Sequence, residues 1–124
     1  MTILIVEDNA EMRRYLVALL RRLTTAIFES SNGREGVAAY ELHQPDWVVM
    51  DIEMPEMDGL AATRAIIQRH PEARVLIVSN YSDPNVRAAA SAAGACGFVP
   101  KERLHGLRAL LADTDGRPLQ HSKD

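Results

Sequence analysis

Short runs of consecutive apolar residues constrain the fold more than any other feature of this sequence. The three clearest runs cover residues 3–6, 47–50 and 75–78. Each is too short for a buried helix and rich in β-branched residues, so each predicts a strand that is buried on both faces. Two weaker candidates, 25–29 and 97–100, bring the predicted strands to five, and the proline that ends the last one favours an edge position.

Helical patterns separate these strands. The first has an apolar stripe from Met12 to Leu23, with arginines such as Arg13 outside it. Further helices are predicted at 33–43, 59–70, 84–93 and 102–112. Strand and helix therefore alternate five times. This alternation predicts an α/β three-layer sandwich, with a parallel sheet covered on both faces. By analogy, five strands in this length suit the flavodoxin-like, doubly wound order 2-1-3-4-5.

Length and composition narrow the class of protein. A chain of 124 residues suits one domain, predicted at 1–112, followed by a flexible tail at 113–124. The net charge of -3, with scattered basic residues, disfavours direct nucleic acid binding. No apolar stretch is long enough to cross a membrane and no signal peptide is evident, so we expect a cytoplasmic protein.

Ionisable and hydroxyl side chains stand at the ends of the predicted strands. Glu7 and Asp8 follow the first strand, Asp51 the third, Ser79 the fourth and Lys101 the fifth. The carboxyl ends of parallel strands share one edge, where this fold class binds its ligands, so we expect these side chains to converge. Three carboxylates at one crevice need a cation, and Mg²⁺ is the hard cation that prefers such oxygens. A single such acid could equally cap the helix that follows, and Asp8 or Asn9 is a candidate cap for the first helix.

These residues also carry a resemblance to a known family. The segments ILIVEDN, VVMDIEMPEMDGL, VLIVSNYSD and GACGFVPK occur in an order and spacing that resembles the receiver domains of two-component response regulators. The resemblance covers residues 2 to about 112.

The resemblance implies a role for each matching residue. Asp51 would take a phosphoryl group, Lys101 would pair with the phosphoryl oxygens, and Ser79 would donate a hydrogen bond to one of them. Mg²⁺, for which Mn²⁺ could substitute, would be bound by Asp8, Asp51, Glu7 (directly or through water) and the backbone carbonyl of Glu53. The domain would be a signalling switch rather than an enzyme, with self-phosphorylation and slow autodephosphorylation.

The resemblance further implies a switch pair and two residues that tune the phosphoryl lifetime. Ser79 and Phe98 would move together on phosphorylation, although plain core packing is the alternative for Phe98. Glu53 and Tyr81 would flank the path of the attacking water. The alanine-rich helix at 84–93 should dock weakly and move as part of the output face, together with 97–100 and 102–112.

The expected partners are a sensor histidine kinase or histidine phosphotransfer protein, and a downstream protein or fused output domain. A homodimer would use the output face, or the first and last helices. A haloacid-dehalogenase-like phosphatase with Asp51 as its nucleophile is the alternative enzyme reading, but it leaves Glu7 and Asp8 unexplained. An FMN-binding flavodoxin-like protein would need a phosphate loop after the first strand, where the two acids would repel phosphate. A degenerate receiver would not keep the complete set of site residues.

Overall fold

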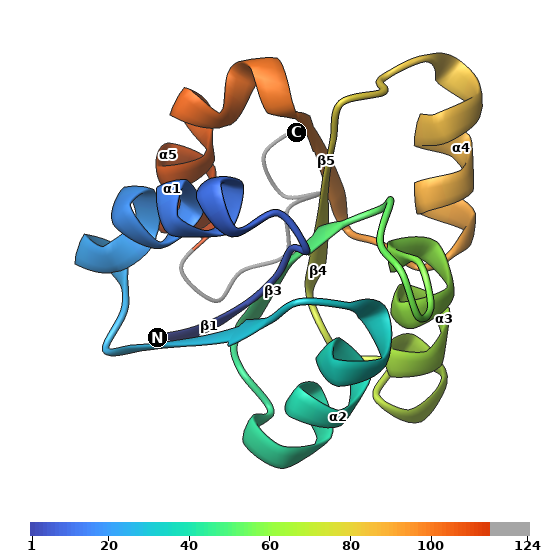
Figure 1. Ribbon diagram of the computed structural model, residues 1–124, viewed down its shortest axis with the longest axis horizontal. Helices are drawn as coiled ribbons and strands as arrows, with labels where there is room; N and C mark the ends of the chain where they lie inside the picture. Colours follow the sequence, from blue (N-terminus) through green and yellow to red (C-terminus); the bar gives the residue numbers. More distant parts are fainter. Residues whose placement is uncertain (115–124) are drawn as a thin grey trace.

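The computed structural model describes residues 1–114 of the chain, with the side chains of 1–112. Within this part, helices alternate with the five predicted strands, as Figure 1 shows. In chain order the elements are β1 (Thr2–Val6), α1 (Ala10–Leu20), the 3₁₀ helix η1 (Arg21–Leu23), β2 (Ala26–Ser30), α2 (Gly33–His43), β3 (Trp47–Asp51), α3 (Gly59–Arg69), β4 (Val75–Ser79), α4 (Pro84–Ala92), β5 (Gly97–Pro100), the 3₁₀ helix η2 (Lys101–Gly106) and α5 (Leu107–Thr114).

The five strands form one parallel sheet in the order β2-β1-β3-β4-β5. This confirms the doubly wound, flavodoxin-like order that was expected by analogy. The order reverses between β1 and β3, which lie side by side at the centre of the sheet. In this fold class the crevice beside such a reversal is the usual ligand-binding position.

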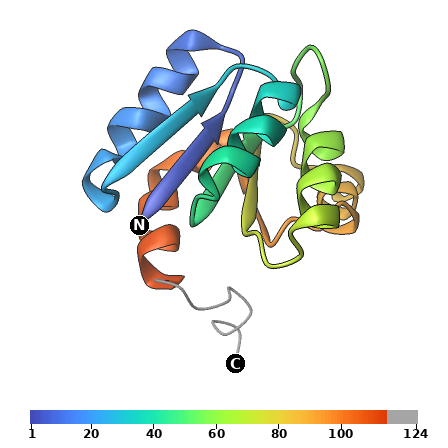
Figure 2. The same cartoon turned by 90° about the horizontal axis from the view of Figure 1, so that it is seen from below.

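The two faces of the sheet are covered by different helices. Alternate strand residues such as Ile5 and Val49 pack with Leu16 of α1 and Leu107 of α5. Their neighbours, such as Val6 and Met50, point to the other face and pack under α2, α3 and α4. Figure 2 shows the sheet between these two layers. Because both faces are buried, the strands are continuously apolar, which is the pattern that predicted them.

Helix N-termini are capped by side chains that follow the strand ends. Each capping oxygen accepts a hydrogen bond from a backbone N–H three residues further on. The caps are Asn9 for α1, Asn32 for α2, Asp58 for α3 and Asp83 for α4. Asn9 is thus the cap of the first helix. The neighbouring carboxylates of Glu7 and Asp8 are not used for capping.

Several predicted boundaries differ from the structure, most of them by one or two residues. β2 starts at Ala26, one residue late, because the hydroxyl of Thr24 binds the carbonyls of Met1 and Ala26 and shapes a turn there. The first helix tightens into η1 after Leu20. The last predicted helix is divided into η2 and α5, since Arg103 has a non-helical backbone (φ -119°, ψ 25°).

α5 ends at Thr114, two residues beyond the predicted domain boundary. The rest of the predicted tail, 115–124, lies outside the described residues.

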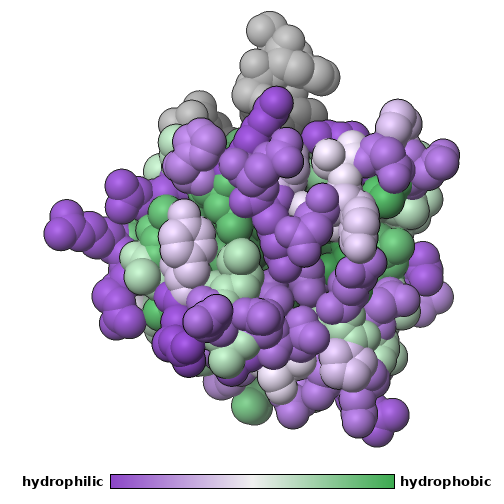
Figure 3. All heavy atoms as spheres, turned by 45° about the horizontal axis from the view of Figure 1, so that its top comes forward, coloured by the Kyte–Doolittle hydropathy of each residue, from purple (hydrophilic) through white to green (hydrophobic). Residues whose placement is uncertain are grey.

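The surface in Figure 3 is mostly hydrophilic, and its apolar atoms form separate patches bordered by polar side chains. Among the described residues, no helix has the length and apolar character needed to span a bilayer.

Candidate functional site

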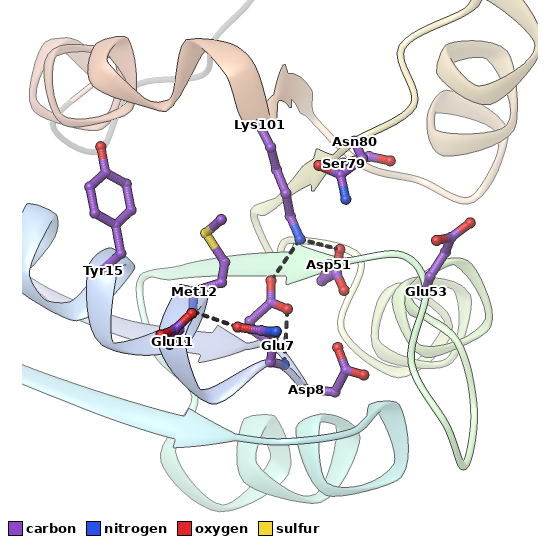
Figure 4. A pocket seen from close by; sticks show the side chains of 11 residues that line it. Glu7, Asp8, Glu11, Met12, Tyr15, Asp51, Glu53, Ser79, Asn80 and Lys101 are labelled. Carbon is purple, nitrogen blue, oxygen red and sulfur yellow. Dashed lines mark hydrogen bonds and ion pairs between the residues drawn. The ribbon is translucent and has the colours of Figure 1, made fainter.

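The predicted site residues meet at the carboxyl edge of the sheet. Asp51 and Ser79 are the last residues of β3 and β4 rather than the first residues beyond them, and Glu7 follows β1 directly. The register pairs Val6 with Met50 and Asp51 with Val78, so the three strand ends lie side by side. Figure 4 shows the side chains from these ends turned toward one crevice.

Three carboxylates form the centre of the site. One oxygen from each of Glu7, Asp8 and Asp51 lies within 4.8 Å of the others. Glu7 and Asp51 are only 1% and 5% exposed, whereas Asp8 is exposed. Lys101, at the start of η2, places its Nζ 3.0 Å from Glu7 Oε1 and 3.0 Å from Asp51 Oδ1. The sequence therefore predicted correctly which side chains converge.

The charges of this cluster shift two pKa values. Burial, followed by the charge of Glu7, raises the pKa of Asp51 from 3.8 to about 6, and the ammonium of Lys101 only partly opposes this. Burial lowers the pKa of Lys101, but the charges of Asp51 and Glu7 outweigh it and raise that pKa overall. One ammonium among three carboxylates leaves a net charge of about -2 when all are ionised. The cluster therefore carries more negative charge than the Lys101 ammonium can balance.

A divalent cation fits this donor set. The ligands are hard carboxylate oxygens, two of them buried and held in place, and the third is open to water, which Mg²⁺ commonly retains in its coordination shell. Burial, and next the charge of Glu7, raises the pKa of Asp51, and a bound cation would favour the ionised carboxylate instead.

The loop after β1 is fixed by contacts that the sequence did not reveal. The backbone N–H of Asn9 donates to Glu7 Oε2 at 3.1 Å, and Arg13 Nη1 donates to the Glu7 carbonyl at 2.7 Å. Arg13 was predicted only as a polar residue on the outer face of the first helix. Arg13 lies one turn into that helix and only a few residues after the acidic pair. This position was the one feature of the sequence that could have indicated the contact.

Asp51 is supported from behind by the start of α3. The N–H of Gly59 donates to the Ile52 carbonyl at 2.7 Å, and a Cβ at Gly59 would overlap the carbonyl oxygen of Asp51. This close approach requires glycine. The glycine was recognised in the sequence as the start of a helix, but not as a support for the acceptor strand.

The crevice opens into a cavity of about 410 Å³. Ser79, 2% exposed, lies in its wall, and its Oγ accepts a hydrogen bond from the N–H of Tyr81, which leaves the hydroxyl proton available to a ligand. The cavity also extends along α1, which the sequence did not indicate. Its lining residues are Glu7, Asp8, Asn9, Glu11, Met12, Tyr15, Asp51, Glu53, Ser79, Asn80 and Lys101.

The remaining predicted residues surround this centre. Glu53 is exposed and lines the cavity, whereas Tyr81 is 54% exposed and does not. Phe98 is half-buried in β5, and the guanidinium of Arg87 from α4 lies 4.7 Å from the centroid of its ring.

Fold and site together define a class: doubly wound α/β proteins with an acidic crevice at the carboxyl edge of a five-stranded sheet. The family model "Response regulator receiver domain" matches residues 3–112. The chain belongs to this family, and it is a receiver of phosphorelay signalling. The haloacid-dehalogenase-like alternative is not supported, since the similar proteins are chemotaxis proteins and response regulators.

Known relatives show how such domains occur. The chain is 39% identical to the chemotaxis protein CheY of Bacillus subtilis, over 80% of this chain and 83% of that protein. It is also 39% identical to the DNA-binding transcriptional regulator NtrC of Salmonella typhimurium, over 78% of this chain but only 21% of that protein. Among solved structures, a CheX–CheY–BeF₃–Mg²⁺ complex from Borrelia burgdorferi superposes with a TM-score of 0.83 at 26% identity, covering 94% of this chain and 88% of that one.

Proposed function

We propose that Asp51 is the phospho-acceptor of this receiver. Its carboxylate oxygen attacks the phosphorus of a phosphohistidine, a P–O bond forms, and the P–N bond breaks with its electron pair leaving on the imidazole, which takes up a proton. The observation that carries this proposal is the placement of Asp51 at a cavity, among two further carboxylates and within 3.0 Å of the Lys101 ammonium.

The proposed cation ligands are Asp8, Asp51, Glu7 (directly or through water) and the Glu53 carbonyl, and Mn²⁺ can replace Mg²⁺. When bound, Mg²⁺ supplies positive charge for the equatorial phosphoryl oxygens. The related Borrelia complex, which contains BeF₃ and Mg²⁺, supports this assignment.

Lys101 and Ser79 act on the phosphoryl group from the other side of the crevice. The Lys101 ammonium already contacts Asp51 and would transfer its contact to a phosphoryl oxygen, while the Ser79 hydroxyl donates to a second oxygen. Both side chains are nearly buried, so their charge and dipole act with little screening by water.

The proposed signal is a change in packing at the output face formed by α4, β5, η2 and α5. Movement of Ser79 toward the phosphoryl group would let the half-buried Phe98 turn inward. Glu53 at the cavity and Tyr81 beside it would set the lifetime of the acyl phosphate, whose slow hydrolysis resets the switch.

The proposed donor is a sensor histidine kinase or phosphotransfer protein, and the output is a separate protein or a fused domain. Both arrangements occur among the relatives, since the chain matches most of CheY and about a fifth of NtrC. Cytoplasmic location, absence of direct nucleic acid binding and a homodimer through the output face or through α1 and α5 remain predictions.

The test is incubation of the protein with Mg²⁺ and acetyl phosphate, followed by intact mass measurement. Wild-type protein should gain one phosphoryl group, and Asp51→Asn should gain none. EDTA should prevent the gain. Asp58→Asn is the matched control: it makes the same chemical change at an exposed helix cap, where asparagine also serves, and it should be phosphorylated normally. Wild-type protein that stays unmodified would contradict the proposal.

A further inference from the structure

We propose that Arg13 is a positioning residue for the cation site, acting by fixing the peptide bond that joins Glu7 to Asp8. This inference rests on the proposed function, because it assumes that Mg²⁺ binds at Glu7, Asp8 and Asp51. Arg13 itself would contact neither the cation nor the phosphoryl group.

Arg13 joins three elements around that peptide. From α1, its Nη1 donates to the Glu7 carbonyl at 2.7 Å, and its Nε lies 3.3 Å from Glu29 Oε1 on β2. The N–H of Glu7 donates to the Ser30 carbonyl at 3.0 Å. The backbone of Glu7 is thus held at both its N–H and its C=O, by two different neighbours. The Arg13 side chain is only 22% exposed, so these contacts are partly shielded from water.

Asp8 depends on this support more than the other acids do. Glu7 is anchored by Lys101 and by the N–H of Asn9, and Asp51 is anchored by its strand and by Lys101. Asp8 is exposed. Among the described residues, its carboxylate has neither a hydrogen bond nor an ion pair, whereas that of Glu7 has both. The orientation of the Asp8 side chain depends on the Glu7–Asp8 peptide plane, which Arg13 fixes. Such supporting contacts orient metal ligands and strengthen binding.

Charge and geometry predict opposite effects for loss of Arg13, which makes the inference testable. Arg13 is a cation near a cation site, and its pairing with Glu29 reduces the repulsion. If Arg13 acted only through charge, removing it would strengthen Mg²⁺ binding. If it positions Asp8, removing it weakens binding.

The experiment is calorimetric titration of the full chain with Mg²⁺ alone, without a phosphodonor. Arg13→Met should weaken Mg²⁺ binding on the order of ten-fold, as found for lost supporting contacts around metal ligands. Arg14→Met is the matched control, since it removes the same charge from the neighbouring, exposed position of α1. It should leave the affinity unchanged or slightly stronger. Arg13→Lys keeps the charge and one donor group, and should restore part of the loss.

Unchanged or tighter Mg²⁺ binding by folded Arg13→Met would overturn the inference and leave the proposed function intact. Wild-type protein that binds no Mg²⁺ would overturn the proposed function itself. If Arg13→Met does not fold, as judged by its melting transition, Arg13→Lys decides: at least a three-fold loss of affinity supports the inference, and any smaller loss overturns it.

Discussion

At the scale of single residues, the site combines groups that a water-exposed surface would keep apart. Asp51 and Glu7 are almost fully buried beside each other, and within residues 1–112 the one cationic side chain paired with their carboxylates is Lys101. Burial of like charges raises the free energy of the ionised state. The metal-free site is therefore strained electrostatically, and this strain is available to favour binding of a cation.

The buried charge of Asp51 should make metal-free protein less stable at alkaline pH. Because its pKa is about 6 when folded and 3.8 as the reference value, the stabilisation by the bound proton is complete below about pH 4 and lost as pH rises through 6. Asp51→Asn should therefore raise the free energy of unfolding in EDTA by roughly 3 kcal/mol at pH 8 but little at pH 4. Urea denaturation at the two pH values measures this.

Excess Mg²⁺ provides the control for this comparison. At pH 8 it should reduce the difference in free energy of unfolding between Asp51→Asn and wild type, because the cation binds the ionised wild-type site and thereby stabilises the folded state. An equal difference in free energy of unfolding between variant and wild type at pH 4 and pH 8 would argue against a raised pKa of Asp51. In the Asp51→Asn variant, Lys101 keeps its ion pair with Glu7, so its ammonium is not left unpaired.

A buried hydroxyl of α3 gives a second prediction at this scale. Thr63 is fully buried, and its Oγ1 finds no hydrogen-bond partner among the residues that the structure describes. Thr63→Val keeps the branched shape and removes an unsatisfied polar group, so it should stabilise the protein by about 1 kcal/mol in urea denaturation. Thr24→Val is the matched comparison, because that hydroxyl lies 2.6 Å from the Met1 carbonyl oxygen and 2.7 Å from the Ala26 carbonyl oxygen, either of which can accept its proton. It should destabilise by about 1 kcal/mol, and equal effects at both positions would refute the assignment.

At the scale of elements, the site depends on where each strand stops and the next helix starts. Glu7, Asp51 and Ser79 stand where β1, β3 and β4 end, and capping residues begin the helices shortly afterward. The closest join is that of β3 to α3, where Gly59 packs directly against the backbone of Asp51.

Gly59→Ala should therefore disturb both stability and phosphorylation. The added methyl group overlaps the Asp51 carbonyl, so the strand or the helix must shift, at a cost of about 1–3 kcal/mol. The rate of phosphorylation by acetyl phosphate should fall together with the melting temperature. Gly106→Ala is the control, because nothing lies within 4 Å of the added Cβ at that position of η2. Equal behaviour of the two variants would contradict the packing argument.

At the scale of the whole molecule, the helices differ in how firmly they pack on the sheet. α1 buries Leu16 and Leu20 and α5 buries Leu107 and Leu111, whereas α4 buries only Ala90. Burial of alanine removes much less apolar area from water than burial of leucine. α4 is therefore held less firmly on the sheet than α1 or α5.

Amide hydrogen exchange should show this difference. Exchange in α4 should be faster than in α1, and phosphorylation should change exchange in α4 more than in α1, because a weakly docked element opens at lower free energy. Peptide-resolved mass spectrometry measures both helices in one sample, so α1 serves as internal control. Equal protection, with no change in α4 on phosphorylation, would exclude α4 as the mobile part of the output face.

Much of the fold and the site was determined by the sequence itself. Buried parallel strands must be apolar throughout, so β1, β3 and β4 were visible as runs, and the alternation with helices indicated the sheet. Parallel strands end at one edge, so Glu7, Asp8, Asp51, Ser79 and Lys101 were predicted to meet. Periodicity and strand direction are local properties, and a sequence displays them directly.

Only the tertiary structure decided the contacts between elements. The turn at Thr24, the contact of Arg13 with Glu7 and the fit of Gly59 against Asp51 each depend on how separate elements pack against one another. The break at Arg103 appears only in its backbone conformation. The raised pKa of Asp51 likewise depends on burial and on Glu7, 44 positions earlier in the sequence. Such properties arise when packing sets distances and excludes water, which the order of residues alone does not specify.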